Sequence, residues 1–413
     1  MNSGILKNGS EEINLTPLYF DYCASTPIDP MVSQVLMSSS LEYYANPSST
    51  HMMGLEIEQL INEARISISN LLGVNSSELI FTSGATESNN LAIFGVIRAL
   101  QNNNRRLHVI TTKIEHPSVI RCIEFLNDQG VDVTYLPVDC NGMVNIESLK
   151  EAIKENTALV SIMQVNNETG AIQPIEDIGN LLKNYPHIYF HVDGVQGFGK
   201  IAISLEYVDL YTISAHKIGG PKGMGLLMKK GHVNISPIMF GGNQEFGIRP
   251  GTTNITGVLS MQEAIKIAVN QQEERLNSLT MIYKRVYSVL HNIDGLHINS
   301  PSPGLGSPHI LNFSYTATSS AIFLSILAKK GIIASSQSAC SSKGSKESRV
   351  LMAICNDQAI ASSSIRLSFH ESITDEDIDR LIEALEQTVI LIKTKKVFSF
   401  LADKSLEEQN IYS

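Results

Sequence analysis

The segment SAHKIGGPKG, residues 214–223, places Lys217 between a histidine and a run of glycines. Residues 208–213 before it are mostly apolar and favour a strand, so the lysine follows a predicted strand end. A lysine removed from water has a lowered pKa and can form a Schiff base with an aldehyde. Taken alone, the motif favours a surface lysine that extends from a turn.

Two further motifs add an anion cradle and a carboxylate. SGATES, residues 83–88, joins a predicted strand to a predicted helix; its small residues and Thr86 suit phosphate binding, and they also suit simple helix capping. In HVDGVQ, residues 191–196, Asp193 follows an apolar strand and needs a cationic or N–H partner, for which a structural ion pair is the alternative. A phosphate anchor, a carboxylate for the pyridinium nitrogen and an amine for the aldehyde are what pyridoxal 5'-phosphate requires.

The elements that must position these residues form a repeating pattern. Short apolar strands alternate with amphipathic helices from residue 78 to residue 217, which predicts a mostly parallel α/β sheet covered on both faces. A long helical stretch over 255–295 ends the alternation, and a loop rich in proline and glycine precedes another α+β segment. We expect a large domain over 27–270, a smaller α+β domain over 1–26 and 271–400, and a polar tail over 401–413.

Composition narrows the classes of function. The 413 residues carry a formal net charge of −10 without a basic cluster, which argues against direct nucleic-acid binding and against an anionic membrane surface. The five cysteines form no C-x-x-C pair, so neither a disulfide framework nor a metal site is predicted. The first residues lack the pattern of a signal peptide and no apolar run reaches the length of a membrane span, so we expect a cytoplasmic protein.

Eight motifs carry a family resemblance, in this order: FDYCASTPIDP, NPSSTH, FTSGATESNN, IEHPSV, SIMQVNNETG, HVDGVQ, SAHKIGGPKGMG and RPGTTN. Together they resemble a cysteine desulfurase of the NifS/IscS type, in the class V aminotransferase branch of the fold-type I enzymes. The resemblance runs from about residue 18 to about residue 390. It implies the α/β fold of a fold-type I transferase dependent on pyridoxal 5'-phosphate, with L-cysteine as substrate.

The resemblance also implies a role for each matching residue. Lys217 would bind the cofactor, Asp193 would pair with the pyridinium nitrogen, and Gln196 would hydrogen-bond the ring oxygen. His116, in IEHP, would lie over the ring and shuttle protons; a helix-capping or core histidine is the alternative. The phosphate would be held by Ala85, Thr86, Ser214 and His216.

Three further residues complete the implied site. Thr252, in RPGTT, would reach the phosphate of the neighbouring protomer, which implies a homodimer with shared active sites. Asn167 and Arg366 would bind the substrate carboxylate, and the planar guanidinium of Arg366 is suited to this task. Asn167 would also contact the cofactor.

A single cysteine decides which reaction is expected. Burial is the default for Cys23, Cys122 and Cys355, whereas Cys340 lies among serines, lysines and glycine in SSQSACSSKGSKESR, residues 335–349. Lys343 and Lys346 would favour its thiolate. The resemblance makes Cys340 the sulfur acceptor, which would become a persulfide as L-cysteine is converted to L-alanine and would then pass the sulfur to an acceptor protein.

Some alternatives stay open at this point. A class V aminotransferase would share the cofactor site without needing Cys340, and a selenocysteine lyase would act on selenium. A non-enzymatic member would be expected to lack Lys217 or Asp193, and both are present. Iron–sulfur cluster assembly, tRNA modification and DNA phosphorothioation are all possible destinations of the sulfur. Gln337 and Gly219 depart from the family pattern, which affects the hinge of the cysteine loop and the packing beside the lysine.

Overall fold

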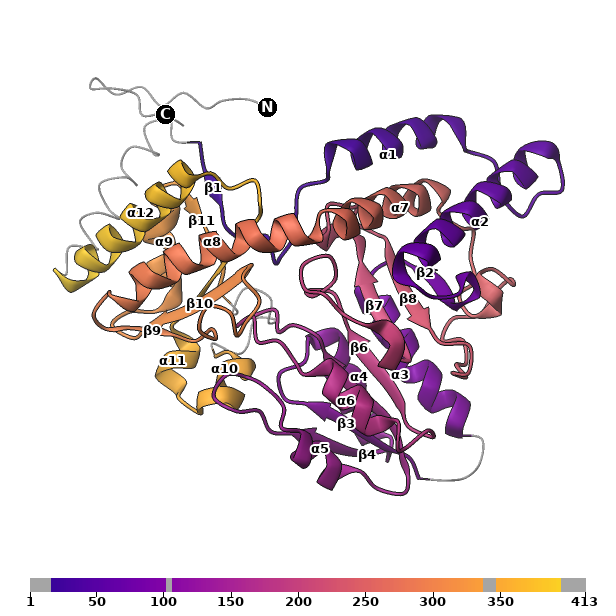
Figure 1. The fold of residues 1–413 in the computed structure, drawn as a ribbon, viewed down its shortest axis with the longest axis horizontal. Helices are drawn as coiled ribbons and strands as arrows, with labels where there is room; N and C mark the ends of the chain where they lie inside the picture. Colours follow the sequence, from indigo (N-terminus) through magenta and orange to yellow (C-terminus); the bar gives the residue numbers. More distant parts are fainter. Residues whose placement is uncertain (1–15, 102–105, 337–346, 395–413) are drawn as a thin grey trace, which may run out of the picture.

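The computed structural model describes residues 16–101, 106–336 and 347–394. Within these ranges the chain forms two lobes, a larger one built around a central sheet and a smaller one that contains the last helix (Figure 1). Cys340 and Gln337 of the predicted cysteine loop lie outside the described residues, as does the predicted polar tail.

The larger lobe is built on a seven-stranded sheet, counted over the described residues. Five of its seven strands, β3 to β7, run parallel to one another, and β8 runs antiparallel to both of its neighbours, β2 and β7. In spatial order the strands are β2 (Leu79–Thr82), β8 (Gly225–Lys229), β7 (Leu210–Ser214), β6 (Tyr189–Asp193), β5 (Thr157–Met163), β3 (His108–Thr112) and β4 (Asp132–Leu136).

Helices cover both faces of this sheet, as the near-continuous apolar strands require. One apolar core joins one face to α3 (Ala85–Leu100) and α4 (Pro117–Asp128). The core on the other face contains residues from α1 (Pro30–Glu42), α2 (Met52–Leu72), α5 (Ile146–Ala152), α6 (Ile175–Leu182) and α7 (Ile255–Asn270). The predicted α/β class with a mostly parallel sheet is therefore confirmed.

The smaller lobe has its own apolar core. An antiparallel sheet in the order β12 (Ser364–Ser368), β10 (Ile310–Tyr315), β9 (Leu296–Ile298) lies at its centre. A short parallel pair, β1 (Leu18–Tyr19) and β11 (Ile332–Ile333), brings the beginning of the described chain to this lobe. The helices are α8 (Gln272–His291), α9 (Ser320–Lys329), α10 (Arg349–Cys355), α11 (Gln358–Ser362) and α12 (Asp375–Lys393).

The long helical stretch expected over 255–295 is two helices. At Gln271 the backbone leaves the helical region, with φ −101° and ψ 6°, and α7 ends where α8 begins. The core of α7 belongs to the larger lobe, while that of α8 belongs to the smaller one. This break supports a domain boundary near residue 270, which we keep as a proposal together with the domain limits stated above.

Over the described residues, no helix combines the length and the apolarity that crossing a bilayer demands.

Candidate active site

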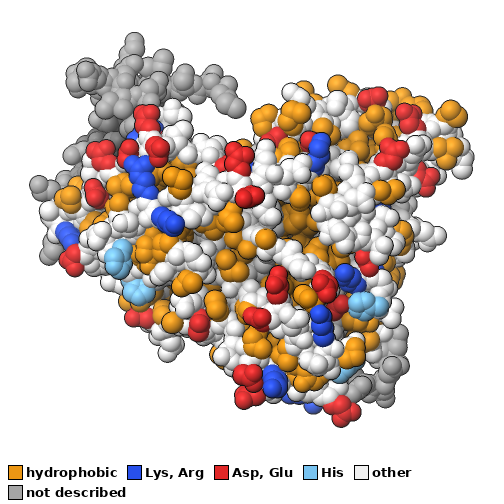
Figure 2. All heavy atoms as spheres, in the orientation of Figure 1, with side chains coloured by type: hydrophobic (Ala, Val, Ile, Leu, Met, Phe, Trp, Pro, Cys, Tyr) orange, Lys and Arg blue, Asp and Glu red, His pale blue; other side chains and the backbone are white. Residues whose placement is uncertain are grey.

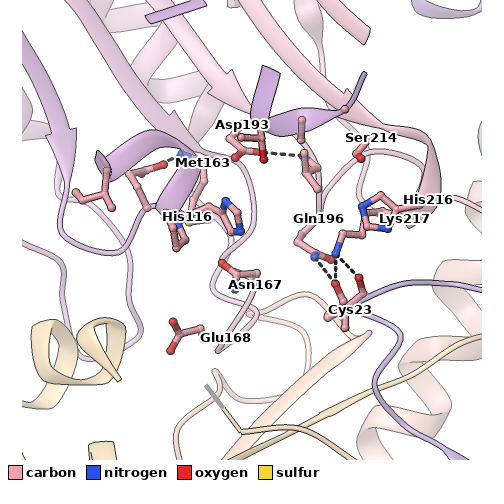
Figure 3. Close-up of a pocket in the computed structure, with 18 of the residues that line it drawn as sticks. Cys23, His116, Met163, Asn167, Glu168, Asp193, Gln196, Ser214, His216 and Lys217 are labelled. Carbon is pink, nitrogen blue, oxygen red and sulfur yellow. Dashed lines mark hydrogen bonds between the residues drawn. The ribbon is translucent and has the colours of Figure 1, made fainter. Parts of the chain in front are cut away.

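A cavity of about 860 Å³ opens at the carboxyl ends of the central strands, beside the smaller lobe. Parallel α/β sheets place their ligand sites at this edge. Ten of the site residues predicted from sequence line this cavity: Ala85, Thr86, His116, Asn167, Asp193, Gln196, Ser214, His216, Lys217 and Arg366. Figure 3 shows most of them converging from separate strands and loops.

Lys217 follows β7 on a short 3-10 turn and extends its side chain towards the N-terminal segment of the chain (Figure 3). Its Nζ donates to the backbone carbonyl of Ala24 at 2.9 Å and also to that of Cys23. Both acceptors are main-chain oxygens of the N-terminal segment, and they hold the amine in position.

The turn after Lys217 contains the glycine that departs from the family pattern. Gly219 adopts φ +80°, where a side chain is strained, so glycine suits the position. Its N–H donates to Thr26 Oγ1 at 3.0 Å, and its carbonyl accepts from the N–H of Asp29 at 2.9 Å. The glycine therefore packs this turn against the segment before α1, in contrast to the looser packing expected from sequence.

Asp193 ends β6 and is 5% exposed. Its Oδ2 accepts from Asn89 Nδ2 at 2.8 Å, and its Oδ1 accepts from the backbone N–H of Val195 at 3.1 Å. Asn89 in turn donates to Ser118 Oγ at 2.9 Å, so the first turns of α3 and α4 both support the carboxylate. The carboxylate is thus buried among neutral donors, and among the described residues it does not form the ion pair that the sequence left as the alternative.

His116 combines two roles that the sequence presented as alternatives. It is the N-cap of α4, because its Nδ1 accepts from the N–H of Ser118 at 3.2 Å, and Pro117 follows at the first helical position. Its ring lies in the cavity, and Figure 3 shows it between Asp193 and Asn167. The surrounding protein lowers the pKa of His116, a shift that Asp193 opposes and Lys217 reinforces, so the ring is held neutral.

The first turn of α3 offers an anion cradle. The N-cap Gly84 has φ +150° and provides no side-chain cap, and Ala85 and Thr86 follow on the wall of the cavity. A Cβ on Gly225 of the neighbouring β8 would lie 2.6 Å from Gly84, so only glycine permits this close approach. Ser214 and His216 face the same space. Desolvation, reinforced by Lys217 and Lys222, lowers the pKa of His216 to about 4.

Arg366 on β12 is contributed by the smaller lobe. It donates to the backbone carbonyl of Asn167 at 2.9 Å and pairs with Asp21 at 2.7 Å. Among the described residues its Nε is a buried donor without a hydrogen-bond partner. A buried guanidinium at a cavity wall with a spare donor is suited to an incoming carboxylate.

Gln196 connects the turn after β6 to the N-terminal segment and to the loop before β10. Its Nε2 donates to the carbonyl of Cys23 at 3.1 Å, and its Oε1 lies 3.3 Å from His309 Nε2. Gln196 and Lys217 therefore share the carbonyl of Cys23 as an acceptor. Cys23 itself is buried, as is Cys122, but the expectation of burial for Cys355 is wrong, because it lies exposed at the end of α10.

Two buried glutamates on the cavity wall were missed from sequence. Desolvation raises the pKa of Glu115 to about 8 and that of Glu168 to about 7. Glu115 Oε1 accepts from Thr112 Oγ1 at 2.8 Å and from the N–H of Met163 at 3.1 Å, which ties β3 to β5. Glu168 accepts from Ser348, the N-cap of α10. Both act as cross-links between elements that form the cavity.

Two predicted residues remain, Thr252 and Cys340. Thr252 is exposed in the loop before α7 and does not line the cavity of its own chain. Arg249 anchors that loop, because its Nε lies 2.8 Å from Glu87 Oε1 in the first turn of α3. Cys340 lies outside the described residues, so its position relative to the cavity is not described.

The sequence and the structure are similar to those of several known proteins. Residues 18–381 match the family model described as aminotransferase class-V. A cysteine desulfurase IscS from Dictyoglomus turgidum is 38% identical over 380 residues, which cover 91% of this chain and 95% of that protein. A solved structure of a NifS-like protein has a TM-score of 0.84 at 35% identity and covers 91% of this chain and 100% of its own. The crystal structure of DndA from Streptomyces lividans has a TM-score of 0.73 at 33% identity, with coverages of 86% and 99%.

Proposed function

Because the chain belongs to the class-V aminotransferase family, among its cysteine desulfurases of the NifS/IscS type, we propose that it converts L-cysteine to L-alanine and stores the sulfur as a persulfide. The observation that carries this proposal is the convergence of three side chains in one cavity: Lys217 and Asp193 from two strand ends of the larger lobe, and Arg366 from β12 of the smaller lobe.

The cavity residues fit pyridoxal 5'-phosphate. The first turn of α3 presents backbone N–H groups that no side chain caps, which suits a phosphate. Asp193 is a buried carboxylate for the pyridinium nitrogen, and Lys217 supplies the amine for the aldehyde. Ala85, Thr86, Ser214, His216, Gln196 and Asn167 are the further residues that would hold the cofactor. When bound, this cofactor supplies an electron sink for the substrate Cα.

The chain's own residues then perform the remaining tasks. Arg366 binds the substrate carboxylate through its donors, with Asn167 beside it. The Lys217 amine is the base that takes the proton from the substrate Cα. The neutral His116 ring keeps Nδ1 as the acceptor of its helix cap, so Nε2 is the atom that carries and transfers a proton.

Sulfur transfer is assigned to Cys340. Its thiolate attacks the sulfur of the substrate, an S–S bond forms, the Cβ–S bond of the substrate breaks, and the carbon that loses sulfur takes up a proton to give alanine. The persulfide then passes its sulfur to an acceptor protein. Relatives named IscS and the DndA neighbour make iron–sulfur cluster assembly and DNA phosphorothioation the two destinations to compare.

Product analysis tests the proposed function against the class V aminotransferase alternative. Purified protein given L-cysteine and a thiol reductant, without any oxo acid, should release alanine and sulfide in equal amounts. Transamination needs an oxo acid as amino acceptor, so turnover that depends on adding one would contradict the proposal. Faster turnover of selenocysteine that is independent of Cys340 would favour the selenocysteine lyase.

We also propose that the protein is a homodimer. Large apolar side chains are exposed on α1 and α2, and Figure 2 shows hydrophobic atoms gathered over these helices. The members of this patch are Met31, Met37, Leu41, Tyr44, Met52, Met53, Leu55 and Ile66. Exposed apolar patches of this kind are typical of protein interfaces. A second copy on this face would also give a role to Thr252, which is exposed, does not line the cavity of its own chain and would serve the partner.

Thr252→Ala is expected to weaken cofactor retention without unfolding the chain, because Thr252 is exposed and its side chain makes no hydrogen bond to the described residues of its own protomer. Loss of one hydrogen bond to a charged phosphate costs about 1.5–3 kcal/mol, so the dissociation constant of the cofactor should rise by about 10- to 100-fold. Dialysis followed by absorbance measures it, and sedimentation should find a dimer throughout. Thr316→Ala, at an equally exposed turn, is the control; a fully active monomer would rule out the shared site.

A further inference from the structure

A second lysine lies directly behind the proposed cofactor lysine. Lys200 is on the turn after β6, the same turn that carries Gln196. Its Nζ donates to the backbone carbonyl of Lys217 at 3.1 Å. Lys200 does not line the cavity, so it contacts the lysine from the protein side and not from the substrate side.

The charge on Lys200 is not compensated by an ion pair. Among the described residues, no carboxylate lies within ion-pair distance of its Nζ, and the nearby Glu371 is already paired with Arg275 at 2.6 Å. Desolvation lowers the pKa of Lys200 to about 8, with Lys217 and Arg275 reinforcing the shift and Cys23 and Glu371 opposing it. Desolvation lowers the pKa of His216, His309 and His370, and the charge of Lys200 adds to each of these shifts.

The interaction between the two lysines is reciprocal. An ammonium group that disfavours the charged form of its neighbour is itself disfavoured by that neighbour to the same extent. A lysine beside another buried cation is thereby kept neutral, which is one of the ways in which proteins activate an amine as a nucleophile or base. The groups around Lys217 include the carbonyls of Cys23 and Ala24, the side chains of His116, His216 and Lys200, and Asp193 on the same cavity wall.

We propose that Lys200 is a positioning residue for Lys217: its ammonium group holds the backbone carbonyl of Lys217 and places a positive charge behind the turn, which tunes the reactivity of the Lys217 amine. The role deepens the proposed function and rests on Lys217 being the cofactor lysine. It differs from a purely structural role because the charge of Lys200 is required and its hydrogen bond alone is insufficient.

The test is a pH titration of the visible absorbance of the cofactor-loaded protein. Lys200→Met removes the cation, so the midpoint of the titration should rise by about one pH unit. Lys200→Gln, which keeps a donor but no charge, should give the same shift and serves as the second variant if the methionine protein folds poorly. Lys200→Arg keeps the charge and should retain the wild-type midpoint.

Lys222→Met is the matched control for charge. Lys222 also acts on His216 but is exposed to solvent, so removing it should move the midpoint by less than about 0.3 unit. A shift as large as that of Lys200→Met would show a general charge effect and overturn the proposal. Unchanged midpoints in both neutral Lys200 variants would also overturn it.

A measurement without the cofactor separates this inference from the proposed function. In cofactor-free protein, the pH dependence of Lys217 acetylation, followed by peptide mass spectrometry, reports the amine directly. Its midpoint should rise in Lys200→Met and stay unchanged in Lys200→Arg. If borohydride fails to link the cofactor to Lys217, the proposed function is wrong, while the acetylation midpoint still decides the role of Lys200.

Discussion

Cys340→Ser is expected to reduce alanine release to background while L-cysteine still changes the absorbance of the bound cofactor. A thiol near Lys343 and Lys346 ionises readily, whereas a serine hydroxyl stays protonated at neutral pH and cannot attack the substrate sulfur. The groups assigned to substrate binding and proton removal, Arg366 and Lys217, are unchanged, so the steps before sulfur transfer should survive.

Mass spectrometry completes this experiment. After a brief pulse of L-cysteine, the wild-type peptide that carries Cys340 should contain one extra sulfur atom. Cys140→Ser and Cys355→Ser are matched controls, because both thiols are exposed and neither lines the cavity. Extra sulfur on another cysteine, or alanine formation at the wild-type rate by Cys340→Ser, would show that the assigned mechanism is wrong.

Lys217→Ala should abolish both the covalent capture of the cofactor and catalysis. The wild-type protein should be yellow, and borohydride should attach the cofactor to the peptide carrying Lys217. Loss of the base alone would lower turnover on the order of 10³-fold, and loss of the amine that captures the cofactor adds to this, so turnover should fall to background.

The neighbouring Lys222→Ala provides the comparison for Lys217→Ala. It removes an exposed lysine from the same loop and should leave borohydride capture at Lys217 intact. Turnover of L-cysteine by Lys217→Ala at a rate close to that of the wild type would contradict the cofactor assignment, whatever the colour of the protein.

The fold was largely predictable because its signals are local. Apolar strands such as β5 and β7, each followed by a helical pattern, are sufficient to indicate a covered parallel sheet. The break at Gln271 was not predictable, because the helical pattern continues across it and only the two separate cores distinguish α7 from α8. Antiparallel pairing of β8 with its neighbours likewise depends on contacts distant in sequence.

Site residues that follow strand ends could be predicted from the sequence. Residues whose pKa is changed by burial in the folded protein could not. Lys217 and Asp193 could be placed at one sheet edge because parallel strands end together. Glu115 and Glu168 sit inside quoted motifs, yet their raised pKa values come from desolvation by residues far along the chain. Lys200 carried no signal, since its contact with Lys217 is set by the turn after β6.

The pairing of β1 with β11 has a consequence for synthesis on the ribosome. The carbonyls of Cys23 and Ala24, which hold the Lys217 amine, belong to a segment that β11 secures in the smaller lobe. The ribosome synthesises these two residues early. Strand β11, which anchors them, is synthesised only after the whole larger lobe, roughly 15–60 s later at typical elongation rates. The nascent chain therefore acquires its complete lysine environment late, and cofactor capture during translation should follow the emergence of β11.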